Sequence, residues 1–468
     1  MEIADNRQSP KIEQVEGINK PVHDSVLGTK SIPVLYLRFA LAGIMANVIL
    51  GVVSVVDGYF ISSFQALEVE GIGIGFTVMV ISRMIGVLFG IGAGAVISLR
   101  LGKGKIEEAR GIMGQTLWFT LFISILLAVL GLVFENQIMT LFGASNESLP
   151  YAIKYSRPLW ISLPVTILAV VLSTLTNIDE KPVLSMSSWL VASIVAATLE
   201  WVLVVKYHMG MMGSSWANTV ALSVPVLLIF YFWFGKTNLK PKWKDMKIKL
   251  KTIGEVAWTG FASFSSQLMM FFAIIFFNNL LQSYGGGLHV AAFTIQNGYI
   301  TNLLAFVALG GMTGLQPIIS YNYGAGNYDR VKQAIKMGLI FTVSLFVILT
   351  ALLIYFVDPI MSFFSGGNSN LQKLGIWTTI VFNCMFTLNA VTLLIAGYFE
   401  AQEKNWTATF INVSKILLFA FPFMFIFPKY FGVDGIWYSG PASEIPGVII
   451  AIYFIRKEFK SLKETKLA

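Results

Sequence analysis

Few ionisable side chains interrupt the long apolar stretches of this 468-residue chain. They are Asp57, Arg83, Glu200, Lys415 and Glu444, and Glu255 lies near the end of a stretch. If these stretches cross a membrane, each such group costs about 2.5–3.5 kcal/mol on insertion scales, so it usually faces a cavity or a partner of opposite charge. These residues are therefore the first candidates for ion binding or substrate contact.

Asp57 lies deep in the first apolar stretch. A carboxylate in that position can bind H⁺ or Na⁺, and its occupancy can change how the helices pack. The alternative is a structural ion pair. Arg83 is a candidate partner for Asp57 or Glu200, or it contacts an anionic part of a substrate. Lys415 and Glu444, in the last two stretches, can pair with each other.

The composition is that of a membrane protein. The chain is 56% hydrophobic and 12% charged, whereas an ordinary soluble domain is about 25% charged. The formal net charge of +8 does not indicate nucleic-acid binding, because the basic residues lie in short loops and form no basic face with interleaved aromatic residues. The single cysteine, Cys384, excludes an intrachain disulfide.

Apolar runs of about 20 residues, each long enough to cross a bilayer, predict an all-α fold of twelve transmembrane helices. They fall near 32–62, 71–99, 112–134, 153–176, 183–205, 213–234, 253–283, 288–318, 334–357, 374–399, 406–428 and 434–455. Most of the 33 Lys and Arg residues fall on the side that carries both tails. Because cytoplasmic loops carry such an excess, we expect both termini in the cytoplasm and a multi-pass protein of the plasma membrane.

The chain also repeats itself at a fixed offset of 222 residues. Leu101-Gly102-Lys103-Gly104 corresponds to Tyr323-Gly324-Ala325-Gly326, and Gly210 and Gly213 correspond to Gly432 and Gly435. With a slip of one residue, Glu180-Lys181 corresponds to Glu403-Lys404. Matches in the same order at one spacing indicate two homologous halves of six helices each. Halves with an even number of crossings share one orientation, so a pseudo-two-fold axis along the membrane normal should relate them.

This repeat predicts five regions. Residues 1–31 form a flexible cytoplasmic tail, 32–235 the first six-helix bundle, 236–251 a lysine-rich cytoplasmic linker, 252–456 the second bundle and 457–468 a cytoplasmic tail. Two parallel bundles that face each other leave a cleft, and rocking of one bundle against the other opens such a cleft to each side in turn.

Motifs for other energy sources and for catalysis are missing from the sequence. Gly235-Lys236-Thr237 is similar to the end of a P-loop, but Phe230 stands where the leading glycine is required. His23, His208 and His289 do not cluster, so no metal site is expected beyond Na⁺ at Asp57 and Glu200. No clustered His, Cys or paired acids accompany a nucleophile, so the sequence favours a secondary transporter without a cofactor over an enzyme.

The repeated motifs resemble those of the multidrug and toxic compound extrusion (MATE) family. Val55-Val56-Asp57-Gly58-Tyr59-Phe60 is similar to the family's first-helix pattern, and Gly90-Ile91-Gly92-Ala93-Gly94 to its second. The run from Gln316 to Asn327, QPIISYNYGAGN, is typical of the bacterial MepA-like branch. The resemblance covers about residues 32–456. It implies a twelve-helix multidrug efflux antiporter of a bacterial inner membrane, which exports organic cations or drugs in exchange for H⁺ or Na⁺.

The resemblance also implies coupling residues. Asp57 matches the family's coupling aspartate, and Glu200 and Asn218 match an acid and an oxygen-bearing residue of a cation site in the N-terminal half. The usual acid there is Asp, and a further amide position is Ala196 in this chain. The loss of one oxygen ligand favours H⁺, which needs a single carboxylate, over Na⁺. The family's other arrangement places acids where this chain has Gln267 and Asn389, so a cation site of that type is not expected.

Gln267 and Asn389 remain candidates for lining the cleft, together with Arg83; a plain interhelical hydrogen bond is the alternative for the two amides. Apolar candidates for the cleft are Phe60, Phe64, Met269, Met270 and Phe293, with core packing as the alternative for each. We expect a monomer that contacts membrane lipids and small organic cations or drugs. Because other members of the wider superfamily flip lipid-linked sugars, a flippase for a lipid carrier or anionic substrate is the alternative function.

Overall fold

The computed structural model describes residues 25–61, 66–235, 237, 239–240, 248–365 and 367–464. Across these ranges the chain forms helices joined by short turns and no strand. The N-terminal half contains α1 (Val26–Thr29), α2 (Ile32–Ile61), α3 (Ala66–Gly102), α4 (Ile106–Val133), α5 (Glu135–Leu141), α6 (Leu149–Ile178), α7 (Pro182–Glu200), a π-helical turn at Trp201–Lys206, α8 (Gly210–Val226) and α9 (Leu228–Phe234).

The C-terminal half begins with a long bent helix. It contains α10 (Leu250–Ile295), a π-helical turn at Gln296–Thr301, α11 (Asn302–Gly324), α12 (Tyr328–Phe364), α13 (Ser369–Asn383), α14 (Phe386–Glu400), α15 (Asn405–Ser414), a π-helical turn at Lys415–Ala420, α16 (Phe421–Ile426), α17 (Pro428–Phe431) and α18 (Val433–Glu464). Gly286 breaks α10 with φ 69° and ψ −170°, a conformation open to glycine and to few other residues.

The predicted number of membrane crossings is confirmed. Ten segments of the described chain are long and apolar enough to cross a bilayer. One of them, Leu250–Gly324, holds two crossings, because the break at Gly286 reverses the chain between the two parts of α10. The remaining crossing is α18, whose hydropathy is lowered by polar and small residues within it, such as Ser443 and Glu444.

The internal repeat is visible in the backbone. Glu180 and Glu403 adopt φ values of 64° and 61°, and Gly104 and Gly326 adopt 75° and 74°. Positive φ is uncommon for any residue with a side chain. Its recurrence at corresponding turns shows that the two halves fold by the same local rules.

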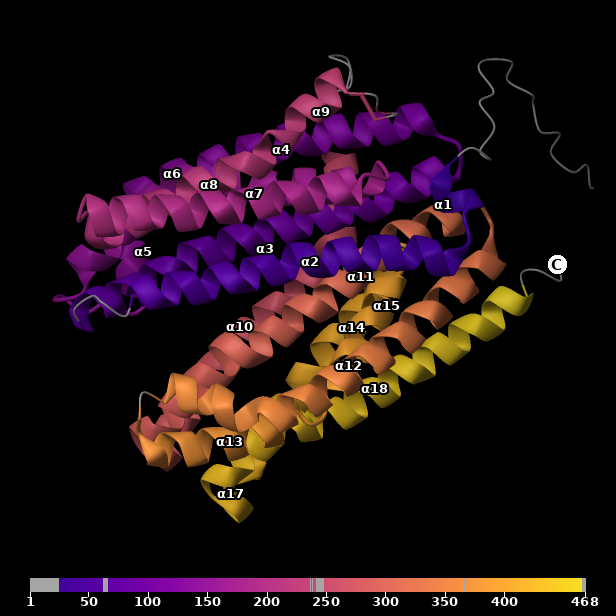
Figure 1. Ribbon diagram of the computed structural model, residues 1–468. Helices are drawn as coiled ribbons and strands as arrows, with labels where there is room; N and C mark the ends of the chain where they lie inside the picture. The colour runs from indigo at the N-terminus through magenta and orange to yellow at the C-terminus, as the bar shows by residue number, and fades with distance from the viewer. Residues whose placement is uncertain are drawn as a thin grey trace, which may run out of the picture.

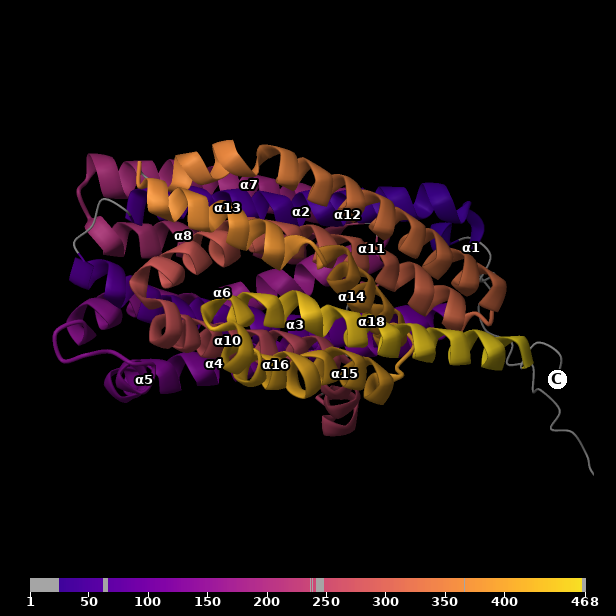
Figure 2. The same cartoon turned by 90° about the horizontal axis from the view of Figure 1, so that it is seen from below.

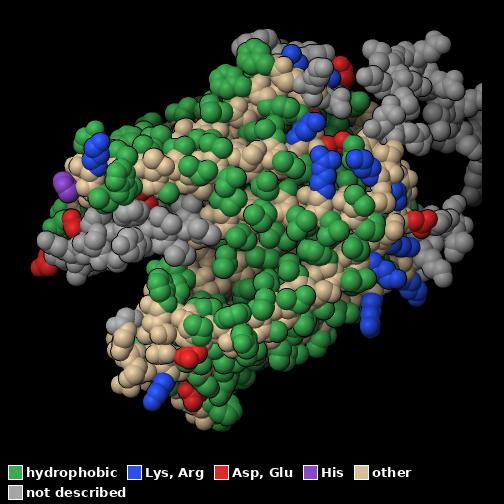
Figure 3. Space-filling view, in the orientation of Figure 1, with side chains coloured by type: hydrophobic (Ala, Val, Ile, Leu, Met, Phe, Trp, Pro, Cys, Tyr) green, Lys and Arg blue, Asp and Glu red, His purple; other side chains and the backbone are tan. Residues whose placement is uncertain are grey.

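The two halves form separate helix bundles that meet at one end and diverge at the other (Figure 1). In both ribbon views α1 and the end of α18 lie at the end where the bundles meet (Figure 2). A buried cluster that includes Phe39, Ile91, Ile319 and Ile335 joins the halves. A second cluster lies mostly in the N-terminal bundle but also includes Val256 of α10, and a third lies within the C-terminal bundle. The space-filling view shows a cleft between the bundles at the far end, and Lys and Arg side chains gathered near the joined end (Figure 3).

The described parts of both predicted tails contact the rest of the protein. Residues 25–29 dock on the protein: Leu27 is 1% exposed, and its backbone N–H donates to Glu180. At the other end α18 continues past residue 457 to Glu464, and Glu458 on it pairs with Lys404. These contacts with distant loops hold the described parts of both segments against the rest of the protein. The linker also ends earlier than predicted, because α10 begins at Leu250.

Candidate functional site

A cavity of about 490 Å³ lies between the bundles. From the N-terminal half it is lined by parts of α3, α7 and α8, and from the C-terminal half by parts of α10, α11, α14, α18 and the π-helical turn after α15. Most of the wall is apolar, with a few polar side chains that include Arg83, Asn218, Gln267, Asn389, Lys415 and Glu444. This composition, apolar walls with few polar groups, is typical of a small-molecule site.

An ion pair with a third polar partner faces this cavity. Lys415 Nζ lies 3.1 Å from Glu444 Oε1 and 3.3 Å from Oε2, and Asn389 Nδ2 donates to the same Oε1 at 2.9 Å. The pairing of Lys415 with Glu444 is therefore confirmed. The structure brings Asn389 to this pair, an association that the sequence pattern did not reveal because the three residues come from different helices.

Arg83 lies in the cavity wall on the N-terminal side. Its guanidinium carbon sits 4.9 Å from the centre of the Phe306 ring on α11, in cation–π geometry. Among the side chains that the structure describes, no carboxylate forms an ion pair with Arg83, so the predicted pairing with Glu200 is not observed. The alternative pairing of Arg83 with Asp57 stays a prediction, because the Asp57 side chain lies outside the part of the chain that the structure describes. Phe306 was not a sequence candidate.

Glu200 and Asn218 lie close together but not in one cavity wall. Glu200 is 1% exposed and accepts a hydrogen bond of 2.8 Å from Ser214 Oγ, while Asn218 Nδ2 donates to the Ser214 carbonyl oxygen at 3.3 Å. Asn218 lines the cavity and Glu200 is buried between α7 and α8. Ser214, which lies one helical turn before Asn218, is the connecting residue that sequence reasoning missed.

Only some of the remaining candidate residues line the cavity. Gln267 lines the cavity, as do Met270 and Phe293. Met269 instead packs against the buried aromatic cluster around Phe277 and Trp437, because adjacent positions of a helix face different ways. The side chains of Asp57, Phe60 and Phe64 are outside the described ones, although Asp57 and Phe60 fall on α2.

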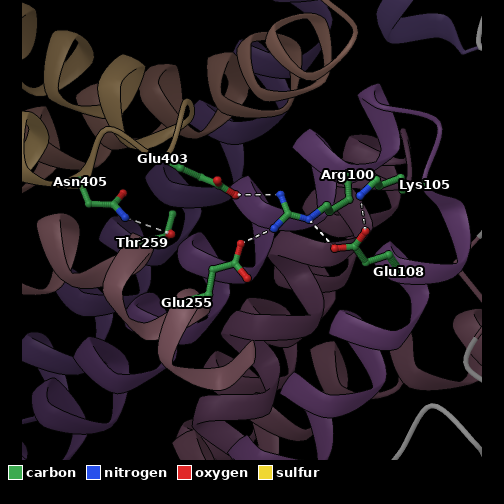
Figure 4. Close-up of polar contacts among 7 residues, drawn as sticks. All are labelled: Arg100, Lys105, Glu108, Glu255, Thr259, Glu403 and Asn405. Carbon is green, nitrogen blue, oxygen red and sulfur yellow. Dashed lines mark hydrogen bonds and ion pairs between the residues drawn. The ribbon is translucent and has the colours of Figure 1, made fainter. Parts of the chain in front are cut away.

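The joined end of the bundles is held by charges that cross between the halves. Arg100, at the end of α3, forms ion pairs with Glu255 on α10 and with Glu403 at 3.6 Å, as well as with Glu108 of its own half at 2.9 Å (Figure 4). Lys105 pairs with Glu108 at 3.1 Å. In the same group of contacts, Asn405 donates to Thr259 (Figure 4). The sequence pattern did not indicate these partners of Arg100, because they come from distant parts of the chain.

Glu403, in the turn between α14 and α15, has a shifted pKa. Burial raises the pKa of its carboxyl, and the nearby Arg100 guanidinium opposes that change only in part. Asp179, at the corresponding turn of the other half, also has a raised pKa because of burial. Both turns therefore hold a carboxyl whose pKa burial raises above its usual value.

Close backbone contacts also seal the joined end. A Cβ on Gly260 would lie 1.9 Å from the Leu88 carbonyl oxygen, and a Cβ on Gly102 would lie 2.0 Å from that of Tyr321. Gln316 Nε2, from α11, donates to the Ile91 carbonyl oxygen at 2.9 Å. The glycines of α3 and α10 therefore allow helices of opposite halves to touch at the backbone.

The chain matches a known protein family in both of its halves. The family model described as MatE matches residues 43–202 and 260–426, in both halves of the chain. The chain is 23% identical over 415 residues to "Multidrug export protein MepA" of Staphylococcus haemolyticus, covering 88% of this chain and 90% of that protein. It is 22% identical over 399 residues to the protein of the same name from Staphylococcus aureus, covering 85% and 87%.

Solved structures share the fold. One named as the outward-facing conformation of a multidrug resistance MATE family transporter has a TM-score of 0.88 at 19% identity, with 96% of this chain and 100% of that chain covered. Another, from Pyrococcus furiosus, is described by a reversed polarity of its binding pocket that suggests a different function; its TM-score is 0.87 at 19% identity, with the same coverage.

Proposed function

This chain belongs to the MatE family, and from that premise we propose that it is a secondary active multidrug efflux antiporter. It exports organic cations or drugs from the cell in exchange for H⁺ or Na⁺. Relatives over most of its length are named multidrug export proteins. The proposal places the protein in the plasma membrane with both termini in the cytoplasm.

The observation that carries the proposal is the cavity between the two repeats. Side chains from both halves line it, and the bundles diverge at one end and are sealed at the other. With the termini in the cytoplasm, the cleft faces the outside. Rocking of the bundles would break the contacts of Arg100 and expose the same cavity to the cytoplasm, which is alternating access.

Coupling is assigned to acidic side chains of the N-terminal half. Asp57 and Glu200 hold the coupling ion, and Asn218 connects that region to the cavity through Ser214. An ion that binds one conformation better than the other shifts the balance between them, so inward flow of the ion can drive export.

The test is transport of ethidium, a fluorescent organic cation, by the purified protein in liposomes. A pH gradient and a Na⁺ gradient are imposed separately. We expect one of them to drive ethidium transport and Asp57→Asn to abolish that response at equal protein incorporation. The proposed coupling would be refuted if neither gradient changed ethidium transport. It would also be refuted if Asp57→Asn still transported ethidium in response to a gradient.

Arg83 favours a second candidate function. Its guanidinium lies in the cavity wall over Phe306, where it can attract an anionic group. A flippase for a lipid carrier or another anionic substrate would use such a cation. Binding of a lipid-linked pyrophosphate that is lost in Arg83→Gln, with ethidium neither bound nor transported, would favour this function over cation export.

A further inference from the structure

The ion pair of Lys415 and Glu444 sits where a transported cation would need an anion. Both side chains line the cavity, and their relative exposures are 14% and 13%. Asn389 fixes one Glu444 oxygen by its 2.9 Å hydrogen bond. All three residues belong to the C-terminal half, so this group does not hold the two bundles together.

Each helix that contributes to the group is irregular at that point. A π-helical turn begins at Lys415, Pro441 and Pro446 bracket Glu444 in α18, and α14 starts three residues before Asn389 after a break in the chain. π-helical turns occur frequently at functional sites, and a proline inside a helix removes a backbone hydrogen bond. A pair that only joined helices would not require three such departures.

Gly447 gives the lysine its position. A Cβ on Gly447 would lie 2.8 Å from Lys415 Cγ and 3.1 Å from Cδ. The lysine stem therefore lies directly on α18, one turn beyond Glu444, and its ammonium reaches back to the carboxylate. A side chain at position 447 would push the lysine away from this path.

Aromatic rings surround the cavity on the same side. Phe277, Phe293 and Phe382 line it, with Phe277 stacked on Phe293 at 4.9 Å and Phe382 edge-on to Phe277 at 5.5 Å. Aromatic faces attract organic cations, and flat rings pack well against one another. A cavity lined by both aromatic rings and the Glu444 carboxylate suits a flat aromatic compound that carries a positive charge.

We propose that Glu444 is the carboxylate that binds the cationic group of the transported compound, and that Lys415 is the resident cation which this group displaces. The ligand class is planar aromatic cations. This inference rests on the proposed export function and specifies which carboxylate receives the substrate. When substrate leaves, the Lys415 ammonium returns to Glu444, so the carboxylate is never left without a cation in the apolar cavity.

The test measures equilibrium binding of ethidium to the purified full-length protein by fluorescence anisotropy. Because Lys415→Met removes the competing cation, we expect ethidium to bind about tenfold more tightly, the equivalent of about 1.4 kcal/mol. Glu444→Gln should weaken binding by about tenfold or more, because it removes the carboxylate that binds the cation. Ethidium affinity in folded Lys415→Met that is unchanged or weaker than in the wild type would overturn the proposal.

Two further variants guard against misfolding and nonspecific charge effects. Gly447→Ala displaces Lys415 without removing it and should also tighten ethidium binding; an unchanged or weaker affinity there contradicts the proposal even if Lys415→Met does not fold. Lys429→Met removes an exposed lysine on α17 and should leave binding at the wild-type level. Nile red, a neutral aromatic dye, should bind wild type and Lys415→Met equally, because no charge competes.

The two proposals fail in different ways. If wild-type protein exports ethidium along an ion gradient while Lys415→Met and Gly447→Ala bind it like wild type, only the role of Glu444 and Lys415 is wrong. If wild-type protein neither binds nor exports ethidium, the export function fails and the inference fails with it.

Discussion

Arg100 at the joined end and Lys415 in the cavity are both cations held by carboxylates inside an apolar protein. Arg100 pairs with Glu255 and Glu403 across the boundary between the halves, whereas Lys415 pairs with Glu444 inside one half. A change in the angle between the bundles must break the contacts of Arg100. The same movement leaves Lys415 and Glu444 in place relative to each other.

The role of an ion pair therefore depends on whether it connects two bundles that move or lies within one of them. A pair that crosses a moving boundary sets the balance between conformations, and its strength must be modest for movement to occur. An ion pair within one bundle can take part in substrate binding, because its two side chains stay close together while the bundles move. The segment at residues 25–30 resembles the first kind, since Leu27 contacts Glu180 of one half and its carbonyl oxygen accepts from Asn322 and Arg330 of the other.

Among these substitutions, Gly260→Ala should separate the two halves most at the joined end. The new Cβ would meet the Leu88 carbonyl oxygen at 1.9 Å, so the halves cannot approach at the joined end. Overpacking of this kind costs about 1–3 kcal/mol, and we expect the upper part of that range because backbone atoms cannot turn aside. Spin labels at positions 107 and 327, in a Cys384→Ser background, should move apart. Gly254→Ala is the matched control on the same helix, because nothing lies within 4 Å of its Cβ; equal label distances in the two variants would contradict the role of Gly260.

Arg100→Gln should also open the joined end, but by less than Gly260→Ala does. Its carboxylate partners are 25–45% exposed, so solvent screens the loss and we expect about 1 kcal/mol, roughly a fivefold shift in population. The same pair of spin labels reports the shift. Lys105→Gln, which loses a pair within one half, should leave the distances at their wild-type values. A shift of equal size in Lys105→Gln would show that net charge, and not the crossing contact, is responsible.

The opening of the joined end should also depend on pH, by a smaller amount, because Glu403 titrates there. Burial raises the pKa of this carboxyl, and the charges around it are those of Arg100, Lys103, Glu108 and Glu255. Opening exposes the carboxyl to water and returns its pKa towards the usual value, so the joined state binds the proton more tightly. Acidification therefore favours the joined end, and raising the pH through the raised pKa weakens it. The spin-label distance distribution should shift in this direction with pH, and Glu403→Gln should reduce the shift. An opposite trend would show that Arg100, not burial, controls this carboxyl.

Lys415→Met should have almost no effect on the same spin-label distances. The pair that it breaks lies within the C-terminal half, so neither conformation gains from its loss. This outcome, beside a measurable change in ethidium affinity, would complete the contrast with Arg100. A separation of the labels as large as that in Arg100→Gln would show that the two ion pairs do not differ in role.

The amino-acid sequence by itself determined the membrane class, the twelve crossings, the two-fold repeat and the family. These depend on hydropathy over about 20 residues and on glycines at turns, which are local properties. It also indicated the pairing of Lys415 with Glu444, because charges in adjacent crossings have few alternatives. The close packing of Gly86, Gly90 and Gly94, which the spacing indicates, is seen against Val170, Thr174 and Ile178 of α6.

Only the tertiary structure decided which distant groups meet. Arg100 and Glu255 are 155 positions apart, and Asn322 and Leu27 are 295 apart. Nothing in the local pattern around either residue selects its partner, because the choice depends on how two preformed bundles dock. The end at which the cleft opens is decided in the same way, since one sequence must support both conformations of a rocking pair of bundles and only their packing distinguishes them.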